Sequence, residues 1–193
     1  MSIKTFRDFV TNLTELADRD PDEAVMLQAA HPLMEDLLRA DQWLPDMYAQ
    51  PNPDRYSQYL LHCDPKERFS IVSFVWGPGQ ETPIHDHTVW GLLGVLRGSE
   101  ISQRYEQEAG AMHKVGELEY LESGQIDMVS PTIGDIHQVR NGLKTRPSVS
   151  IHVYGGNIGR INRHAFKNDG SQNSFVSGYS SETVPNIWMA DKP

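Results

Sequence analysis

The chain has 193 residues, of which 38% are hydrophobic and 22% charged, with a formal net charge of −9 and one cysteine. This composition predicts a folded protein of one domain with a sizeable core. The negative charge argues against nucleic acid as a partner. One cysteine permits no internal disulfide, the N-terminus lacks the apolar core of a signal peptide, and no segment has the roughly 20 apolar residues of a membrane span. We therefore expect a cytoplasmic protein.

The N-terminal part, residues 1–48, is predicted to be helical. Apolar residues from Phe6 onward recur at spacings of three and four, which is typical of a helix with one buried face. A second helix is expected to begin with Asp20 as its N-cap and Pro21 in its first turn. Pro32 is expected to interrupt or restart that helix, since proline has no backbone N–H to donate.

Residues 50–165 consist of short runs rich in Val, Ile, Tyr, Phe and Trp, separated by Gly, Pro and Asp. Many short, closely spaced strands predict a closed antiparallel β-barrel or jelly roll, so the fold class is mainly β with preceding α-helices. The expected strands cover residues 55–62, 68–76, 82–90, 92–100, 101–107, 118–130, 137–141 and 148–155. The polar segment 166–193 carries several aromatic residues, and we expect it to pack on the barrel.

Three histidines occur in patterns that suit a metal site. His85 and His87 are two residues apart, and such residues point to the same face of a strand, as two neighbouring metal ligands must. His137 follows a glycine turn and would add a third imidazole from an adjacent strand. By itself an H-x-H pair is more often a surface feature than a metal site. The interpretation therefore depends on the surrounding residues.

Polar and apolar residues alternate in the segment 148–154. Ser150, His152 and Tyr154 fall on one face, while the residues between them are Ile and Val. Alone, this pattern predicts a half-exposed strand with a solvated polar face. In a small barrel that holds ligands, the same polar face would line the cavity.

The residues around the histidines resemble the two sequence motifs of the cupin superfamily. The first motif is matched by Gly79, His85, His87 and Gly98. The second is matched by Pro131, Gly134, His137 and Asn141, with the proline and glycine one residue further apart than usual. Gly91 stands where the first motif usually has a glutamate. A common non-haem iron site has two histidines and one carboxylate, so this departure is informative.

Three neutral imidazoles without a carboxylate would leave the full charge of Fe(II), which favours an anionic ligand such as a thiolate. Here the sequence resembles the thiol dioxygenases of the cysteine dioxygenase family, which have three histidine ligands and a Ser-x-His-x-Tyr triad. The resemblance implies one Fe(II) per chain. The implied ligands are His85, His87 and His137, and the implied catalytic triad is Ser150, His152 and Tyr154.

Two departures from that family concern the substrate. Mammalian-type members have a cysteine shortly after H-x-H that crosslinks to the tyrosine, but here the stretch has no cysteine, so Tyr154 should be a free phenol. Their carboxylate-binding arginine is replaced here by Gln58. This resembles bacterial 3-mercaptopropionate dioxygenases, in which an arginine after the triad is thought to bind the carboxylate. Arg160 and Arg163 are both available, and the spacing to the tyrosine favours Arg163.

The resemblance therefore implies an enzyme that converts 3-mercaptopropionate and O2 to 3-sulfinopropionate. One alternative is a dioxygenase of another small carboxylate thiol, cysteine or mercaptosuccinate. An alternative of another class is a non-catalytic cupin that senses a small ligand. The sequence does not indicate an oligomeric state.

Overall fold

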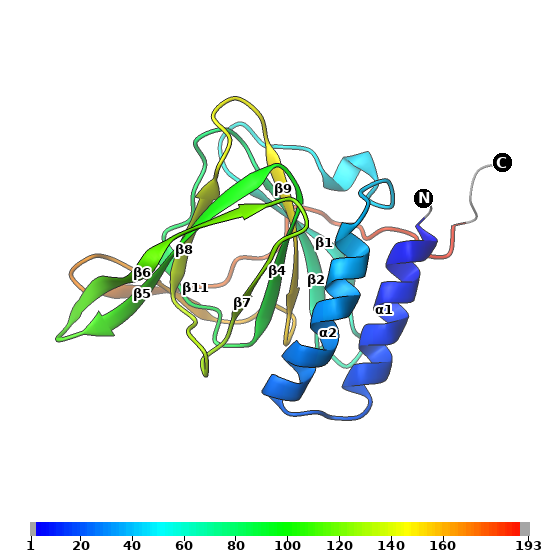
Figure 1. Cartoon of the computed structure of the whole chain (residues 1–193), viewed down its shortest axis with the longest axis horizontal. Coiled ribbons are helices and arrows are strands. Elements are labelled where there is room, and N and C mark those ends of the chain that lie inside the picture. The colour runs from blue at the N-terminus through cyan, green and yellow to red at the C-terminus, as the bar shows by residue number, and fades with distance from the viewer. Residues whose placement is uncertain (1–2, 190–193) are drawn as a thin grey trace.

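The computed structural model describes residues 3–189, and two helices lie against one side of a β-barrel (Figure 1). The helical elements are α1 (Lys4–Ala17), α2 (Glu23–Leu38) and the short 3-10 helix η1 (Asp46–Tyr48). The strands are β1 (Ser57–Cys63), β2 (Ser70–Trp76), β3 (Ile84–His85), β4 (Gly91–Arg97), β5 (Ser99–Glu108), β6 (Ala111–Glu122), β7 (Ile126–Val129), β8 (His137–Asn141), β9 (Ser148–Tyr154), β10 (Arg163–Phe166) and β11 (Gln172–Phe175).

The strands form two sheets. The five-stranded sheet has the order β1-β2-β9-β4-β7, and the six-stranded sheet has the order β11-β10-β3-β8-β5-β6. Every ladder between these strands is antiparallel. The expectation of a mainly β, antiparallel barrel preceded by helices is confirmed.

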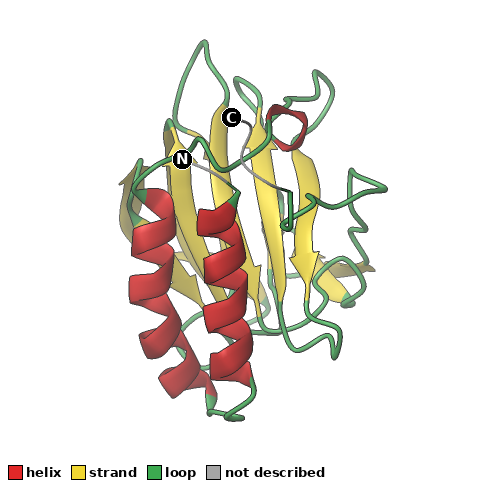
Figure 2. Cartoon of the chain, turned by 90° about the vertical axis from the view of Figure 1, so that its right-hand side faces the viewer, coloured by secondary structure: helices red, strands yellow, loops and turns green. Residues whose placement is uncertain are grey.

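The two helices lie over part of the outer face of the five-stranded sheet (Figure 2). Strand β9 lies at the centre of this sheet, between β2 and β4. Its apolar residues Val149, Ile151 and Val153 belong to the core that also contains the apolar faces of α1 and α2. Because side chains alternate along a strand, the polar residues of β9 point into the barrel. The helices thus allow both faces of β9 to be buried.

Two expectations about the second helix are wrong. The N-cap of α2 is Asp22, whose carboxylate accepts a hydrogen bond from the Val25 N–H at 2.9 Å. Asp20 has a left-handed backbone with φ of 49°, whereas an N-cap needs an extended one. Pro32 lies inside a continuous helix. Ala30 and Met34 on either side of it are both fully buried in the same core, and this packing offsets the hydrogen bond that proline cannot make.

The strand boundaries also differ from the expected ones. The expected strand 118–130 is two strands, β6 and β7, because the chain turns at Gly124, where φ is 90°. The segment expected to follow the barrel begins inside it: β10 ends at Phe166, and β11 pairs with β10 at the edge of the six-stranded sheet. Residues 190–193 of that expected segment lie outside the described residues.

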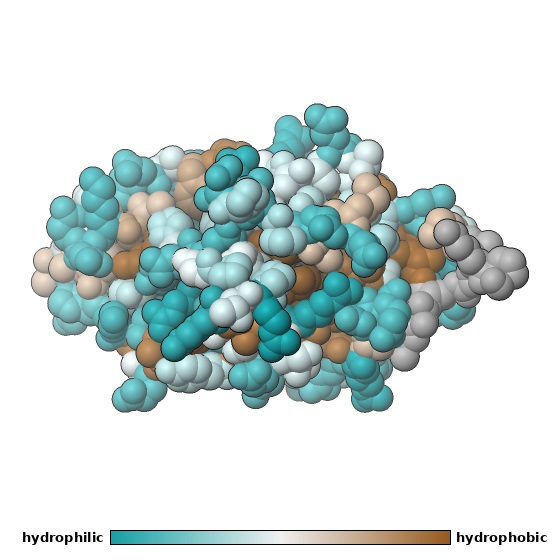
Figure 3. Space-filling view, turned by 90° about the horizontal axis from the view of Figure 1, so that it is seen from above, coloured by the Kyte–Doolittle hydropathy of each residue, from teal (hydrophilic) through white to brown (hydrophobic). Residues whose placement is uncertain are grey.

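Hydrophilic residues cover most of the face seen from above, with small hydrophobic areas between them (Figure 3). Within residues 3–189, no helix combines the length and the apolar character that crossing a bilayer requires.

Candidate metal centre and active site

The three histidines expected as ligands come together inside the barrel. His85 on β3 is the ladder partner of His137 on β8, and His87 lies two residues after the end of β3. One ligand atom from each ring lies within 4.8 Å of the other two, and the ring centroids are 4.8 to 4.9 Å apart. All three side chains are buried. This is the arrangement that three ligands on one face of a metal ion require.

The second nitrogen of each ring has a partner that orients it. The Nδ1 contacts are His85 to the Pro83 carbonyl at 3.1 Å, His87 to Asp135 Oδ1 at 2.9 Å, and His137 to the Ser102 hydroxyl at 3.4 Å. The Nε2 atoms are left as the metal donors, which is how ligating histidines are usually held. His87 Nε2 is buried and has no hydrogen-bond partner in the described part of the chain. The residues present therefore fit a metal ion.

Asp135 holds the segment after β3 in place. Its carboxylate accepts hydrogen bonds from the backbone N–H groups of His87 and Thr88 as well as from the His87 ring. These hydrogen bonds keep the pKa of Asp135 below its usual value although burial acts in the opposite direction. Burial lowers the pKa of His85 to about 3, so this ring is neutral and able to bind a metal. Sequence reasoning missed Asp135, although it lies two residues before His137.

The expected triad forms a hydrogen-bonded chain beside the histidines. The Ser150 hydroxyl is 2.8 Å from His152 Nε2, and His152 Nδ1 is 2.8 Å from the Tyr154 hydroxyl. Burial raises the pKa of Tyr154 well above its usual value and lowers the pKa of His152. The side chains of the triad are therefore uncharged at neutral pH. The Tyr154 ring stacks on His87 with centroids 5.3 Å apart, which places the phenol next to the metal centre.

Gly91 explains why no carboxylate reaches the metal centre from β4. It is the ladder partner of Tyr154, and a Cβ atom at this position would lie 3.0 Å from the tyrosine ring. The space of a side chain is thus filled by Tyr154 itself. The one cysteine of the sequence, Cys63, is on β1, and strand β2 separates it from Tyr154 on β9. Its thiol donates to the Asp64 carbonyl.

A cavity of about 130 Å³ opens beside His85. The residues that line it come from five parts of the chain: Tyr56, Gln58, Phe74, Thr82, Pro83, His85, Arg163, Ala165 and Phe175. Both residues expected to bind a substrate carboxylate, Gln58 and Arg163, are among them. Its volume suits a molecule of a few non-hydrogen atoms next to the metal centre.

Arg163 is 3% exposed and is held by β11 and the residues just after it. Its guanidinium donates to the Ser177 hydroxyl at 2.7 Å and lies over the Phe175 ring at 4.7 Å. Its Nε atom is buried and has no partner among residues 3–189, so a donor remains for a ligand. Arg160, in contrast, is exposed and pairs with Glu67 at the surface.

Sequence reasoning also missed Ser102, Phe175 and Ser177, because residues distant in sequence meet only after the sheets close.

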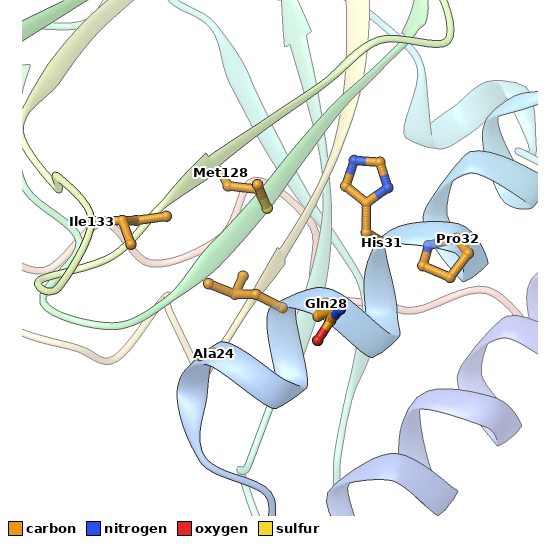
Figure 4. A pocket seen from close by; sticks show the side chains of 7 residues that line it. Ala24, Gln28, His31, Pro32, Met128 and Ile133 are labelled. Carbon is orange, nitrogen blue, oxygen red and sulfur yellow. The ribbon is translucent and has the colours of Figure 1, made fainter.

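A larger cavity, of about 440 Å³, lies away from this centre between α2 and β7 (Figure 4). Its lining includes Leu27 and Met128 but no member of the histidine group or the triad.

Comparison with known proteins identifies the family. The family model for cysteine dioxygenase type I matches residues 1–167. The chain belongs to the cysteine dioxygenase family. It is 28% identical to cysteine dioxygenase type 1 of Rattus norvegicus over 155 residues, which cover 78% of this chain and 74% of that protein. It is 30% identical to cysteine dioxygenase type 1 of Homo sapiens over 112 residues, which cover 56% of this chain and only 54% of the human protein.

Among solved structures, a Klebsiella pneumoniae protein with a double-stranded β-helix domain matches with a TM-score of 0.44 and 23% identity, over 58% of this chain and 82% of that chain. Cysteine dioxygenases are metal-dependent members of the cupin superfamily. In this member the group formed by His85, His87 and His137 is where a metal ion fits.

Proposed function

We propose that this protein is an Fe(II)-dependent thiol dioxygenase that converts 3-mercaptopropionate and O2 to 3-sulfinopropionate in the cytoplasm. The observation that carries the proposal is a buried three-histidine group with the neutral Tyr154 stacked on it, next to a small cavity that His85 and the buried Arg163 line. In the reaction the thiol sulfur gains both atoms of O2. Sulfur is oxidised by four electrons and O2 is reduced by four, so no external reductant is needed.

The three neutral imidazoles would hold Fe(II), which would bind the thiolate and O2 and accept electron density between them. The chain itself positions the reactants. Because the pKa of Tyr154 is raised, its phenol stays protonated and donates a hydrogen bond beside His87. His152 holds that phenol, and Ser150 holds His152. Phe74 stacks on His152 at 4.2 Å and closes this side of the cavity with an apolar wall.

The substrate carboxylate would bind Arg163, whose free Nε donor faces no partner in the described protein. Gln58 lines the same cavity and offers an amide donor. A charge-assisted hydrogen bond to arginine is worth about 1.5–3 kcal/mol. The carboxylate would thus anchor one end of the substrate and leave the thiol to reach the metal centre beside His85.

The cavity lining also bears on which thiol binds. Cysteine differs from 3-mercaptopropionate by an ammonium group, and the residues that line the cavity in the described structure include no carboxylate to pair with it. An ammonium ion would lie near the positive charge of Arg163 and near Phe74 and Ala165. This supports a thiol carboxylate without an amine. Cysteine remains the second candidate, because the curated relatives named above are cysteine dioxygenases.

The test combines metal analysis with oxygen uptake by the purified protein. We expect about one iron per chain and oxygen consumption that depends on added thiol. A panel of 3-mercaptopropionate, cysteine, mercaptosuccinate and cysteamine, compared by kcat/KM, should rank 3-mercaptopropionate first. Iron-loaded protein without thiol-dependent uptake would reject the enzyme and favour a ligand sensor. Cysteine in first place would reject only the substrate.

A further inference from the structure

The barrel contains a buried carboxyl group that the reaction described above does not use. Glu100 on β5 is 3% exposed. Its Oε1 atom is buried and makes no hydrogen bond within residues 3–189. The side chains whose polar groups interact with it are Ser150 and Trp76. Glu100 therefore lies at the far end of the hydrogen-bonded chain that leads through Ser150 and His152 to Tyr154.

The hydrogen atoms of this chain can be assigned by counting donors. The Trp76 indole can only donate, and it donates to the Ser150 hydroxyl at 3.3 Å. That uses one of the two acceptor positions of the Ser150 oxygen. One O–H and one acceptor position remain, and they must be shared between His152 Nε2 and Glu100. The protonation state of Glu100 decides how they are shared.

If Glu100 is protonated, it donates to Ser150, and Ser150 donates to His152 Nε2. The proton of His152 is then on Nδ1 and is donated to the Tyr154 oxygen at 2.8 Å, so that the Tyr154 O–H is free. If Glu100 is ionised, every bond reverses: Ser150 donates to Glu100, His152 Nε2–H donates to Ser150, and Tyr154 donates to His152 Nδ1. The two arrangements differ by one proton, which resides on Glu100.

The surroundings of Glu100 favour the protonated form. Its ladder partners are Asn141 on β8 and Leu121 on β6, which are uncharged, and so are Ser150 from β9 and Trp76 from β2. Burial raises the pKa of Glu100 to about 8, although the two donors act in the opposite direction. Most molecules therefore carry the proton at neutral pH.

We propose that Glu100 is a positioning residue whose proton orients the chain of Ser150, His152 and Tyr154 so that the Tyr154 O–H donates into the metal pocket. The kinetic consequence rests on the proposed function, whereas the protonation of Glu100 does not. Above the pKa of Glu100 the chain reverses, Tyr154 becomes an acceptor toward the pocket, and kcat should fall.

The first test is infrared difference spectroscopy of the full-length protein and the E100Q variant. The expected result is a carbonyl stretching band of a protonated carboxylic acid at pH 7, which is absent in E100Q and disappears from the wild type as the pH rises through about 8. The E117Q variant, which makes the same change on the exposed side of β6, should retain the band. A wild type without this band at pH 7 would overturn the proposal, whether or not the protein oxidises thiols.

The second test compares E100A and E100Q in kcat. Loss of a partner that orients such a chain lowers activity about 10-fold to 100-fold, so E100A should fall by that amount. The side-chain amide introduced by E100Q still donates to Ser150, so this variant should restore most of the rate and lose the decline above pH 8. E100Q that is as slow as E100A, or that keeps the alkaline decline, would contradict the role of the proton. A protein that shows the band but no thiol-dependent oxygen uptake would reject the proposed function and still support a protonated Glu100.

Discussion

The two faces of β9 lie in opposite environments. On one face, Val149 and Ile151 pack against the apolar layer under the helices, which contains no member of the candidate site. On the other, Ser150 and Tyr154 belong to a buried polar chain beside the histidines. Both faces are excluded from water, so burial alone does not distinguish them. The difference is that one face is satisfied by packing and the other by hydrogen bonds.

This division predicts which substitutions should alter stability and which should alter activity. The helices pack on the outer face of the five-stranded sheet, so this face can be apolar (Figure 2). The inner face is then free to hold polar groups whose partners are supplied by other strands. Changes on the helix side should therefore lower the free energy of unfolding, and changes on the barrel side should lower metal binding or kcat.

The largest effect is expected for His137→Ala on the barrel side. It removes one of three ligands, so the iron content should fall to background and thiol-dependent oxygen uptake should be lost. Metal analysis and circular dichroism of the same sample measure binding and folding together. His113→Ala, on exposed β6, is the matched control and should keep its iron. Full iron content in the His137 variant would contradict the ligand assignment.

On the helix side, Ile151→Ala should lower the free energy of unfolding by about 2–5 kcal/mol, because Ile151 is fully buried and its removal leaves a cavity. Chemical denaturation measures this change. Folded protein should still bind iron in the same ratio. If iron binding fell while stability was kept, the two faces would not be separable in the way described.

Tyr154→Phe tests the inner face of the same strand. The phenyl ring keeps the stacking on His87 but lacks the hydroxyl that bonds to His152. We expect kcat to fall roughly 100-fold, within the range typical of a lost proton donor, with iron retained. Steady-state oxygen uptake and metal analysis check the two parts. Loss of iron would mean that Tyr154 is a metal ligand.

Arg163→Ala should weaken substrate binding rather than the chemical step. The lost charge-assisted hydrogen bond corresponds to about 1.5–3 kcal/mol, or a rise in KM of roughly 10-fold to 150-fold for a thiol carboxylate. Cysteamine, which has no carboxylate, should be affected little. Arg160→Ala, at the surface, serves as the control. Equal losses for both thiols would reject the carboxylate contact.

The smallest effect concerns a polar contact on the helix side. Hydrogen bonds from Arg68 lower the pKa of Asp64 from 3.8 to about 2. Because the folded-state pKa is the lower one, the stabilisation of about 2 kcal/mol is present above pH 4 and is lost as the pH falls toward 2. The difference in the free energy of unfolding between wild type and Asp64→Asn should shrink over that range. A constant difference would show that the charge of Asp64 does not contribute.

Much of the inner face could be predicted because its residues are close in sequence. The H-x-H pair and the Ser-x-His-x-Tyr segment follow the two-residue period of a strand, so their common orientation follows from local geometry. The place of Gly91 in the motif likewise predicted the absence of a carboxylate. The structure adds the cause, which is the Tyr154 ring in the space of a side chain.

The groups that complete the site could not be predicted in this way. Asp135, Ser102 and Glu100 reach their partners across sheets or around a loop, and their own segments show no pattern that marks them. The same reason explains the missed strand β11 (Gln172–Phe175), whose first three residues are polar and which gains its place only by pairing with β10. Local periodicity predicts which way a side chain points, but not what it meets.

We propose that the barrel side of β9 serves the addition of both atoms of O2 to a thiol. Its most direct test is the reaction of iron-loaded protein with 3-mercaptopropionate under ¹⁸O2, followed by mass spectrometry of the product. We expect a sulfinate in which both oxygen atoms carry the label. A disulfide, or a sulfinate with one oxygen from water, would contradict it.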